Sequence, residues 1–364
     1  MKWSPEQEGA LAAVSNWLEG GENQVFRLFG YAGTGKTTLA CHFANDLSGK
    51  TLFGAFTGKA ALVMRSKGCK NASTIHSMIY KLDDAGAGSP QFTLDPRSAL
   101  TKASLCVIDE CSMVDAELAR DLLSFNIPVL VLGDPEQLPP VKGAGFFTNA
   151  PPDFMLSEVH RQARDNPIIR MSMDVREGRS LEMGDYGESR IISRDDITPD
   201  DVLSAEQLLV GSNATRRKYN QHLRGLRDIH NEMPQTGERL VCLRNNRRKG
   251  LLNGGIWTVA EIEMVTTNAI KMTLEPVDAG GRRKNAHVIV RKEFFLGEGD
   301  KLSWPERKDT DEFDFGYALT VHKSQGSQWN DVFLFDQSAM FRDQARRWLY
   351  TGITRAAERI TVVM

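Results

Sequence analysis

The 364-residue sequence predicts a parallel α/β fold that carries a small all-β insertion, and three observations support this fold class. Short apolar strands alternate with helical segments between residues 24 and 133, which is typical of a parallel sheet. Residues 236–309 instead contain short segments of alternating polarity separated by turns rich in Gly, Asn and Arg, which indicates a small β barrel. The chain is also longer than one hydrophobic core usually supports, so we expect two or more domains.

The individual elements follow from local patterns. Ser4 can cap a first helix, and Pro5 suits its first position. Apolar runs then predict strands at 24–30, 51–56, 105–109 and 129–133, and helical spacing of apolar residues predicts helices at 37–47, 60–66 and 115–123. Residues 78–100 interrupt this alternation with Gly, Pro and Asp, so we expect a small insertion there. The α/β pattern resumes at Gly316.

Composition limits the possible function classes. Lys and Arg number 45 against 47 for Asp and Glu, a net charge of -2, so a nucleic-acid site would have to be a local basic stripe. Five cysteines without a C-x-x-C pair or a histidine cluster predict reduced thiols rather than a metal site or a disulfide framework. No apolar run approaches the roughly 20 residues of a membrane span, and no signal-peptide core is evident, so we expect a cytoplasmic protein without a membrane partner.

The strongest motif is GYAGTGKT, which lies between a predicted strand and a predicted helix. It matches the phosphate-binding loop G-x-x-x-x-G-K-[ST], whose backbone N–H groups hold the phosphates. Lys36 is expected to reach the β- and γ-phosphates, and the Thr37 hydroxyl to bind Mg²⁺. ATP or GTP binding is therefore favoured over a structural turn. The candidate nucleotide-binding residues of the motif are Gly30, Gly33, Thr34, Gly35, Lys36, Thr37 and Thr38.

Two further strand ends carry residues that suit phosphoryl chemistry. LCVIDE delivers Asp109 as a candidate Mg²⁺ ligand and Glu110 as a candidate for polarising the attacking water. A solvated acidic turn is the alternative. GDPEQLPPV follows the next strand, where Gln137 can hydrogen-bond a γ-phosphate or the attacking water, and Pro139 stiffens the segment. An Asp- and Pro-rich structural turn would have the same composition.

The C-terminal segment LYTGITRAAERITVV places Arg355 after a Gly- and Thr-containing turn. An arginine that faces the phosphate-binding loop from a second domain can stabilise transition-state charge as an arginine finger. An ordinary surface charge is the alternative, and the hypothesis requires the two α/β parts to face each other.

Taken in order, these motifs resemble those of superfamily 1B helicases of the RecD and phage Dda group. The series comprises GYAGTGKT, AFTGKAA, TIH, VIDE, GDPEQLPPV, VHRQ, ALTVHKSQGSQWNDV and YTGITRAAER, and it covers the chain from Gln7 to about Val363. The resemblance implies two RecA-like domains, 1–77 with 101–150 and 151–235 with 310–364, with ATP between them. It also implies a pin-type insertion at 78–100 and an SH3-like β insertion at 236–309.

The resemblance further implies an activity and residue roles. The activity is ATP-dependent 5′ to 3′ movement along single-stranded DNA with unwinding of forked duplex, by a compact monomer that could meet replication or recombination proteins. Gln7 resembles an adenine-reading glutamine, and Arg161 and Arg355 resemble the two arginines that reach the γ-phosphate. Phe92 is the one aromatic candidate for a strand-separating wedge in the first insertion.

DNA contacts are expected from loops at strand ends, because such loops carry binding sites in this fold class. The candidates are Thr57, Lys59, Thr74, His76, Phe92, Pro139, Thr320, His322, Lys323 and Ser324. His322 to Gln328 form a stretch without aliphatic side chains, predicted to be a loop with ligands on both faces, with Gln325 and Gly326 toward the nucleotide. The basic segment 244–249 either neutralises DNA phosphates or is solvated loop charge.

Two other functions remain open from the sequence. The chain could be a DNA-stimulated ATPase or translocase subunit that needs a partner to unwind DNA. It could instead be a P-loop kinase or nucleotide-gated switch with no DNA partner, which would leave GDPEQLPPV and TRAAER unexplained.

Overall fold

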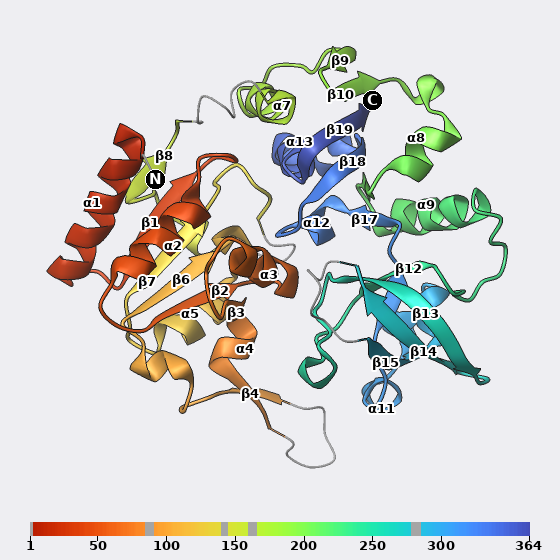
Figure 1. Cartoon of the computed structure of the whole chain (residues 1–364), viewed down its shortest axis with the longest axis horizontal. Coiled ribbons are helices and arrows are strands. Elements are labelled where there is room, and N and C mark those ends of the chain that lie inside the picture. The colour runs from red at the N-terminus through yellow and green to blue at the C-terminus, as the bar shows by residue number, and fades with distance from the viewer. Residues whose placement is uncertain (1–2, 84–90, 140–144, 159–165, 278–284) are drawn as a thin grey trace. The chain divides into compact units, whose positions relative to one another are not determined.

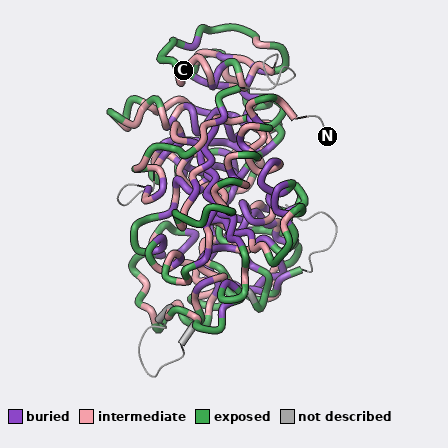
Figure 2. Tube along the Cα trace, turned by 90° about the vertical axis from the view of Figure 1, so that its left-hand side faces the viewer, coloured by how far each residue is buried: buried purple, intermediate pink, exposed green. Residues whose placement is uncertain are grey.

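A computed structural model describes residues 3–83, 91–139, 145–158, 166–277 and 285–364 (Figure 1). Contacts between residues group the chain into two compact units. Unit 1 comprises Met1–Leu181 with Asp343–Thr354, and unit 2 comprises Glu182–Arg342 with Arg355–Met364. Buried residues gather in the interior of the trace, and exposed residues follow its outer loops (Figure 2).

Unit 1 is built on a six-stranded parallel sheet, as the sequence predicts. Its strand order is β3-β2-β6-β7-β1-β8, and every described pairing in it is parallel. The strands are β1 (Val25–Gly30), β2 (Thr51–Ala55), β3 (Ser73–Thr74), β6 (Leu105–Asp109), β7 (Val129–Gly133) and β8 (Phe154–Leu156). Because the strands are parallel, their carboxyl ends meet at one edge, where the candidate motifs lie.

Helices cover both faces of this sheet. One core joins α1 (Pro5–Gly20), α2 (Lys36–Asp46) and α3 (Gly58–Ser66) to one face. A second core joins α4 (Ile75–Ile79) and α5 (Ala116–Leu123) to the other. Neighbours in β6 alternate between the two cores, as residues of a two-sided sheet must: Leu105 and Val107 belong to the first, Cys106 and Ile108 to the second. The remaining helices of unit 1 are α7 (Pro167–Arg176) and α13 (Ala345–Ile353).

The boundary of unit 1 lies later than the predicted change of domain at residue 151. The reason is that β8 pairs with β1, at Leu28↔Phe154 and Gly30↔Leu156, so this segment completes the first sheet. Helices α7 and α13 also group with unit 1. The division into two RecA-like working domains stays a prediction.

The insertion after α4 contains an antiparallel pair, β4 (Tyr80–Asp83) with β5 (Gln91–Leu94). A hairpin is therefore present where residues 78–100 break the α/β pattern. Phe92 faces Leu82 in the register, but its side chain lies outside what the structure describes.

Unit 2 contains a second sheet, of order β17-β11-β18-β19-β10-β9. Its strands are β9 (Gly184–Tyr186), β10 (Ser189–Ile192), β11 (Gln207–Val210), β17 (Ala318–Thr320), β18 (Trp329–Phe335) and β19 (Ala356–Val363). Only the β9 and β10 pairing is antiparallel among those described. Helices α8 (Pro199–Ser204) and α9 (Asn213–Gly225) pack on one face, and α12 (Val321–Ser324) follows β17.

The predicted all-β insertion at 236–309 contributes four strands of a five-stranded antiparallel sheet in unit 2, of order β15-β14-β13-β12-β16, and the fifth strand, β16, lies after residue 309. It consists of β12 (Arg239–Cys242), β13 (Ile256–Val265), β14 (Ala269–Pro276), β15 (Ala286–Arg291) and β16 (Phe313–Phe315), with α10 (Lys292–Phe295) and α11 (Trp304–Arg307). Trp257 is buried in its core. Two buried ion pairs from α9 hold it, Arg216 to Asp314 and Arg224 to Glu238, both at 2.7 Å.

Short 3-10 helices complete the described elements. They are η1 (Ala99–Lys102), η2 (Cys111–Met113), η3 (Phe147–Asn149), η4 (Arg194–Asp196), η5 (Arg247–Lys249), η6 (Gly299–Lys301) and η7 (Ser338–Gln344). Within the described ranges, no helix is both long and apolar enough to cross a bilayer.

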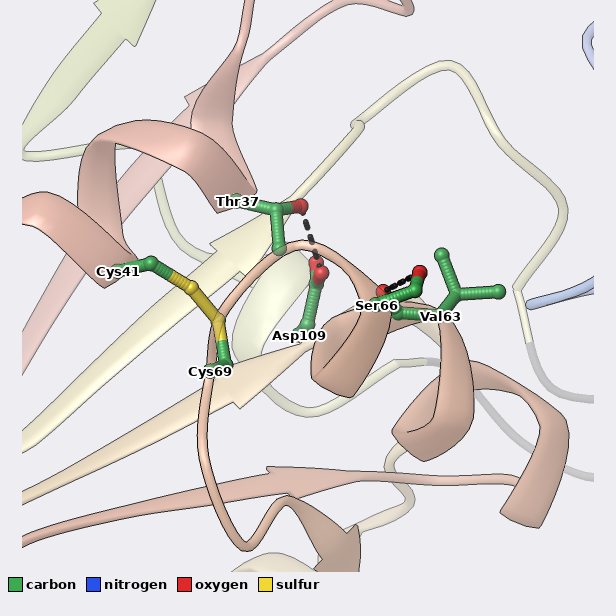
Figure 3. Close-up of a disulfide and its surroundings, with 6 residues drawn as sticks. All are labelled: Thr37, Cys41, Val63, Ser66, Cys69 and Asp109. Carbon is green, nitrogen blue, oxygen red and sulfur yellow. Dashed lines mark hydrogen bonds between the residues drawn. A yellow bond between two sulfur atoms is a disulfide. The ribbon is translucent and has the colours of Figure 1, made fainter. Parts of the chain in front are cut away.

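The prediction that all five cysteines are reduced thiols is wrong for one pair. Cys41 on α2 and Cys69 after α3 form a disulfide, with their Cα atoms 5.4 Å apart (Figure 3). The two residues lie 28 positions apart in sequence, and packing of α2 and α3 on the same face brings them together. Cys106, Cys111 and Cys242 are free and buried.

Candidate nucleotide-binding site

The phosphate-binding loop between β1 and α2 needs its glycines for conformation and for space. Gly33 and Gly35 have φ values of 81° and 84°, in the left-handed region that glycine adopts without strain. A Cβ on Gly30 would lie only 2.8 Å from Cβ of Leu156 in β8. The loop is therefore fixed by backbone geometry and by the neighbouring strand.

Lys36, at the start of α2, folds back over this loop. Its Nζ donates to the carbonyl oxygens of Gly30 at 2.6 Å and Tyr31 at 2.9 Å. The Thr34 hydroxyl donates to the same Tyr31 oxygen at 2.9 Å. A positive group thus sits within the turn that would hold phosphates, and Thr38 lies in the first turn of the same helix.

Thr37 and Asp109 are in direct contact, as the two motifs predict. The Thr37 hydroxyl donates to Oδ2 of Asp109 at 2.7 Å (Figure 3). Asp109 also accepts from the backbone N–H of Glu110 at 2.9 Å. Glu110 has a φ of 53°, uncommon for a residue other than glycine, so the backbone leaves the extended conformation of β6 at this residue. A hydroxyl and a carboxylate are hard oxygen donors, so this pair fits Mg²⁺.

Gln7 connects the first helix to the phosphate-binding loop. Its Oε1 accepts from the N–H of Ser4 at 3.1 Å, which completes a capping box at the start of α1. Its Nε2 donates to the carbonyl oxygen of Thr34 at 3.2 Å. Gln7 is buried, and its contact with Thr34 means that the predicted adenine-reading residue lies beside the loop.

The turn after β7 is held by α13. The Tyr350 hydroxyl donates to Oδ2 of Asp134 at 2.6 Å, and Thr351 Oγ1 accepts from the N–H of Leu138 at 3.0 Å. Gln137 lies in this turn and is buried. Burial raises the pKa of Asp134. Tyr350 and Asp134 are not among the predicted site residues, although they lie inside the motifs LYTGITRAAERITVV and GDPEQLPPV.

The candidate DNA contacts of unit 1 lie where β2, β3 and β7 end. Thr57 caps α3 by accepting from Ala60 N–H at 3.1 Å, and Thr74 caps α4 by accepting from Ser77 N–H at 3.2 Å. His76 packs against the ring of Phe56, and burial lowers its pKa. Pro139 is half-buried at the end of the turn.

Lys59 lies in the helix that follows β2 rather than in a loop, and its DNA contact stays a prediction. It lies inside α3 and is 6% exposed. The helix begins at Gly58, two residues earlier than predicted, because Thr57 caps it. The side chain therefore belongs to the helix that packs on the sheet.

The stretch after β17 also differs from the predicted open loop. Val321–Ser324 form α12, capped by Thr320, whose Oγ1 accepts from the N–H of Lys323 at 3.2 Å. Ser324 is fully buried, and its hydroxyl donates to the Val321 carbonyl oxygen at 2.8 Å. His322 packs beside the ring of Phe341. The polar side chains of Thr320 and Ser324 therefore form hydrogen bonds within a short helix, and a buried turn follows it.

The following residues, Gln325 to Ser327, are also buried, and Gly326 has a φ of 73°. They lead from the carboxyl end of β17 to the amino end of β18. Arg355 lies there, 3% exposed, and donates to the carbonyl oxygen of Ser327 at 3.3 Å. The stretch therefore crosses from the carboxyl ends of the parallel strands of the second sheet to their amino ends. Arg161, the other predicted arginine, lies outside the described residues.

Arg244 and Lys249, two of the four cations in the basic segment 244–249, are paired within unit 2. Arg244 pairs with Glu312 at 2.9 Å and Lys249 with Asp311 at 2.5 Å, and both carboxylates are buried. For these two residues the ion pairs argue against phosphate neutralisation and show paired rather than solvated charge.

Comparisons with known proteins support the class of molecule that these features define, a P-loop nucleotide-binding protein with parallel α/β units. A family described as AAA domain matches residues 2–194, and one described as UvrD-like helicase C-terminal domain matches residues 315–363. The chain belongs to the family described as AAA domain, and its relatives place it among the superfamily 1B helicases.

Individual relatives agree with this placement. The chain is 29% identical to the ATP-dependent RecD2 DNA helicase of Deinococcus radiodurans over 96% of this chain and 48% of that protein. It is 33% identical to the DNA helicase Dda of phage T4 over 41% of this chain and 37% of that protein. The chain thus spans about half or less of the length of these relatives.

A solved structure shares the fold. A Pif1 helicase, described in a study of unwinding at forked duplex DNA, aligns with a TM-score of 0.60 at 18% identity. The alignment covers 99% of this chain and 92% of that one. It supports the parallel-sheet RecA-like architecture predicted from the sequence.

Proposed function

We propose that this chain is an ATP-dependent DNA helicase that moves 5′ to 3′ along single-stranded DNA. The observation that carries the proposal is the grouping of three motifs at one edge of the first sheet. Lys36 follows β1, Asp109 ends β6, and Gln137 follows β7. Membership of the superfamily 1B helicases supports the choice of a DNA motor over other P-loop functions.

In the proposed chemistry, Lys36 exchanges its two carbonyl partners for the β- and γ-phosphates of ATP. Thr37 and Asp109 would hold Mg²⁺, which supplies neutralisation of phosphate charge when it is bound. Glu110 would polarise the attacking water, and Gln137 would orient that water or the γ-phosphate. Gln7 would recognise adenine, since its amide already lies against the loop at Thr34.

Two arginines would complete the reaction. Arg355 of unit 2 and Arg161, which lies outside the described residues, are proposed to reach the γ-phosphate, with Gln325 and Gly326 of unit 2 in the same region. Arg355 is held beside Ser327 at the amino edge of the second sheet, whereas Thr320 and His322 lie at its carboxyl end. We propose that the stretch between them links nucleotide state to DNA grip.

DNA would contact the strand-end residues of both sheets. In unit 1 these are Thr57, Thr74, His76 and Pro139, and in unit 2 Thr320, His322 and Lys323. The β4 and β5 hairpin would act as the pin, with Phe92 as its wedge, and the five-stranded sheet as the SH3-like insertion that steadies the strand. A monomer is the proposed working form, with forked duplex DNA as its substrate.

The decisive experiment is the ATP hydrolysis rate with no nucleic acid, with single-stranded DNA and with single-stranded RNA. DNA should stimulate hydrolysis, whereas equal rates in all three conditions would favour a P-loop kinase or switch. Forked duplexes with a 5′ or a 3′ tail then test polarity and unwinding. Activity on the 3′-tailed fork alone would contradict the proposed direction, and DNA-stimulated hydrolysis without unwinding would favour a translocase that needs a partner.

A further inference from the structure

The hydroxyl of Tyr350 on α13 joins two parts of the candidate site that are distant in sequence. It accepts from the backbone N–H of Ala32, in the phosphate-binding loop, at 3.1 Å. It donates to Oδ2 of Asp134, in the turn after β7, at 2.6 Å. Tyr350 is 1% exposed and Asp134 is 2% exposed. Water cannot easily replace the bond to Asp134, so losing the hydroxyl would leave a buried acceptor unsatisfied and would also remove the partner of the part-buried Ala32 N–H.

The same turn is held at other points around Gln137. Oδ1 of Asp134 accepts from the N–H of Glu136 at 3.0 Å, and Thr351, the neighbour of Tyr350, accepts from the N–H of Leu138. The residues on both sides of Gln137 are thereby fixed to Asp134 or to α13. A displacement of Tyr350 would therefore also displace Gln137.

The phosphate-binding loop is held on its own side as well. The guanidinium of Arg176 on α7 lies 3.7 Å from the centre of the Tyr31 ring, next to Ala32 in the chain. Helices α7 and α13 thus contact successive residues of the loop just before the glycines. The hydroxyl keeps its proton at neutral pH, because burial and then the nearby Asp134 raise the pKa of Tyr350 well above its usual range.

We propose that Tyr350 is a positioning residue that sets the phosphate-binding loop and the Gln137 turn in one arrangement. Nucleotide affinity and the placement of Gln137 then depend on the same hydroxyl group. This inference rests on the proposed ATP site, and it adds a residue whose contacts are to protein groups rather than to the nucleotide.

The test replaces one oxygen atom. Tyr350→Phe should weaken equilibrium binding of a fluorescent, non-hydrolysable ATP analogue by about 5- to 20-fold, which corresponds to one unsatisfied buried group. Tyr80→Phe is the matched control, because the Tyr80 hydroxyl also donates to a carboxylate, that of Asp121, in the same unit. The control should bind the analogue within about twofold of the original protein, which is the scatter expected for a distant site.

A second pair of variants separates positioning from general damage. Thr351→Val removes the acceptor for Leu138 and leaves the Ala32 contact, so it should lower kcat while analogue affinity stays unchanged. Gln137→Ala should lower kcat less in the Tyr350→Phe background than in the original protein, because the turn is already displaced. Affinity for single-stranded DNA without nucleotide should stay the same in Tyr350→Phe.

Three results would overturn the inference. They are unchanged analogue affinity in Tyr350→Phe, an equal loss in Tyr80→Phe, or an equal cost of Gln137→Ala in both backgrounds. A failure of the proposed function looks different, because the unmodified protein itself would then fail to bind the analogue. Should Tyr350→Phe not fold, Thr351→Val still tests the inference. A loss of analogue affinity in Thr351→Val would contradict it, because that variant keeps the Tyr350 contact with Ala32, which is proposed to set the phosphate-binding loop.

Discussion

The phosphate-binding loop of unit 1 and the basic segment 244–249 of unit 2 both carry cations, but the cations have different partners. Lys36 donates to two backbone carbonyl oxygens, those of Gly30 and Tyr31. Arg244 and Lys249 pair instead with the carboxylates of Glu312 and Asp311. The first cation interacts with dipoles and the other two with full negative charges.

This difference decides which cations are available to an anion. A phosphate can replace carbonyl dipoles at a gain, because it brings a full charge to the ammonium group. It would have to separate Lys249 from Asp311, and a buried carboxylate left without its cation is costly. Basic residues of the same type in the sequence are therefore not equal candidates for phosphate binding.

The largest expected effect tests the available cation. Lys36→Ala should reduce DNA-stimulated ATP hydrolysis by roughly 100-fold or more, since an oriented positive group on the reacting phosphate contributes on the order of 3 kcal/mol. Thermal unfolding followed by circular dichroism should show little change. Lys50→Ala, at an exposed lysine after α2, is the control and should keep its activity. Retained hydrolysis in Lys36→Ala would remove the distinction between the two regions.

The next effect concerns the most deeply paired cation. Arg224→Ala should lower the free energy of unfolding by about 3–5 kcal/mol, because it leaves Glu238 buried without its partner. Arg359→Ala breaks an exposed pair with Asp331 and should cost less than about 1 kcal/mol. Urea unfolding measures both. Equal losses would mean that burial does not determine the value of these pairs.

A pH effect is expected at Lys323, a half-buried cation on α12. Burial, and then the guanidinium of Arg216, lower its pKa to about 8 from an ordinary value of 10.5. Between these two pH values the unfolded chain holds more protons, so this residue makes stability rise with pH across that window. Lys323→Met should abolish that part of the rise in urea unfolding at pH 7, 8, 9 and 10. Parallel curves for both proteins would contradict the assignment.

The smallest effect tests the paired cation of the basic segment. Lys249→Ala should change affinity for single-stranded DNA by less than about twofold, because its charge is already matched by Asp311. The slope of log affinity against log salt should not change, whereas loss of a true phosphate contact would reduce it by roughly 0.7. A reduced slope would place Lys249 on the DNA and break the comparison.

The sequence predicts well whatever depends on neighbours along the chain. The strands at 105–109 and 129–133 coincide with β6 and β7 because apolar runs end at residues that favour turns. The grouping of Lys36, Asp109 and Gln137 then follows from parallel topology, which brings strand ends to one edge. Local pattern also predicts a small insertion at 78–100 and an all-β segment at 236–309, where the structure has the β4 and β5 pair and most of the five-stranded sheet.

Pairings across long sequence distances could not be predicted. Tyr350 and Asp134 are separated by 216 positions, and nothing local connects them. Lys59 and the stretch from Ser324 to Ser327 are polar in sequence yet buried, because surrounding elements close over them. Cys41 and Cys69 meet only because α2 and α3 share a face of the sheet. In each case tertiary packing determines which residues meet or become buried, and a local sequence motif carries no information about that packing.

The two ends of the Gln7 amide have a practical consequence for handling the protein. One end completes the first turn of α1 with Ser4, and the other holds the phosphate-binding loop at Thr34. A fusion partner that continues as a rigid helix into α1 would prevent Ser4 and Gln7 from forming this cap. Because the same Gln7 side chain also bonds to Thr34, the phosphate-binding loop would be disturbed as well. Affinity tags should therefore be joined through a flexible linker that leaves residues 4–7 to form their own cap.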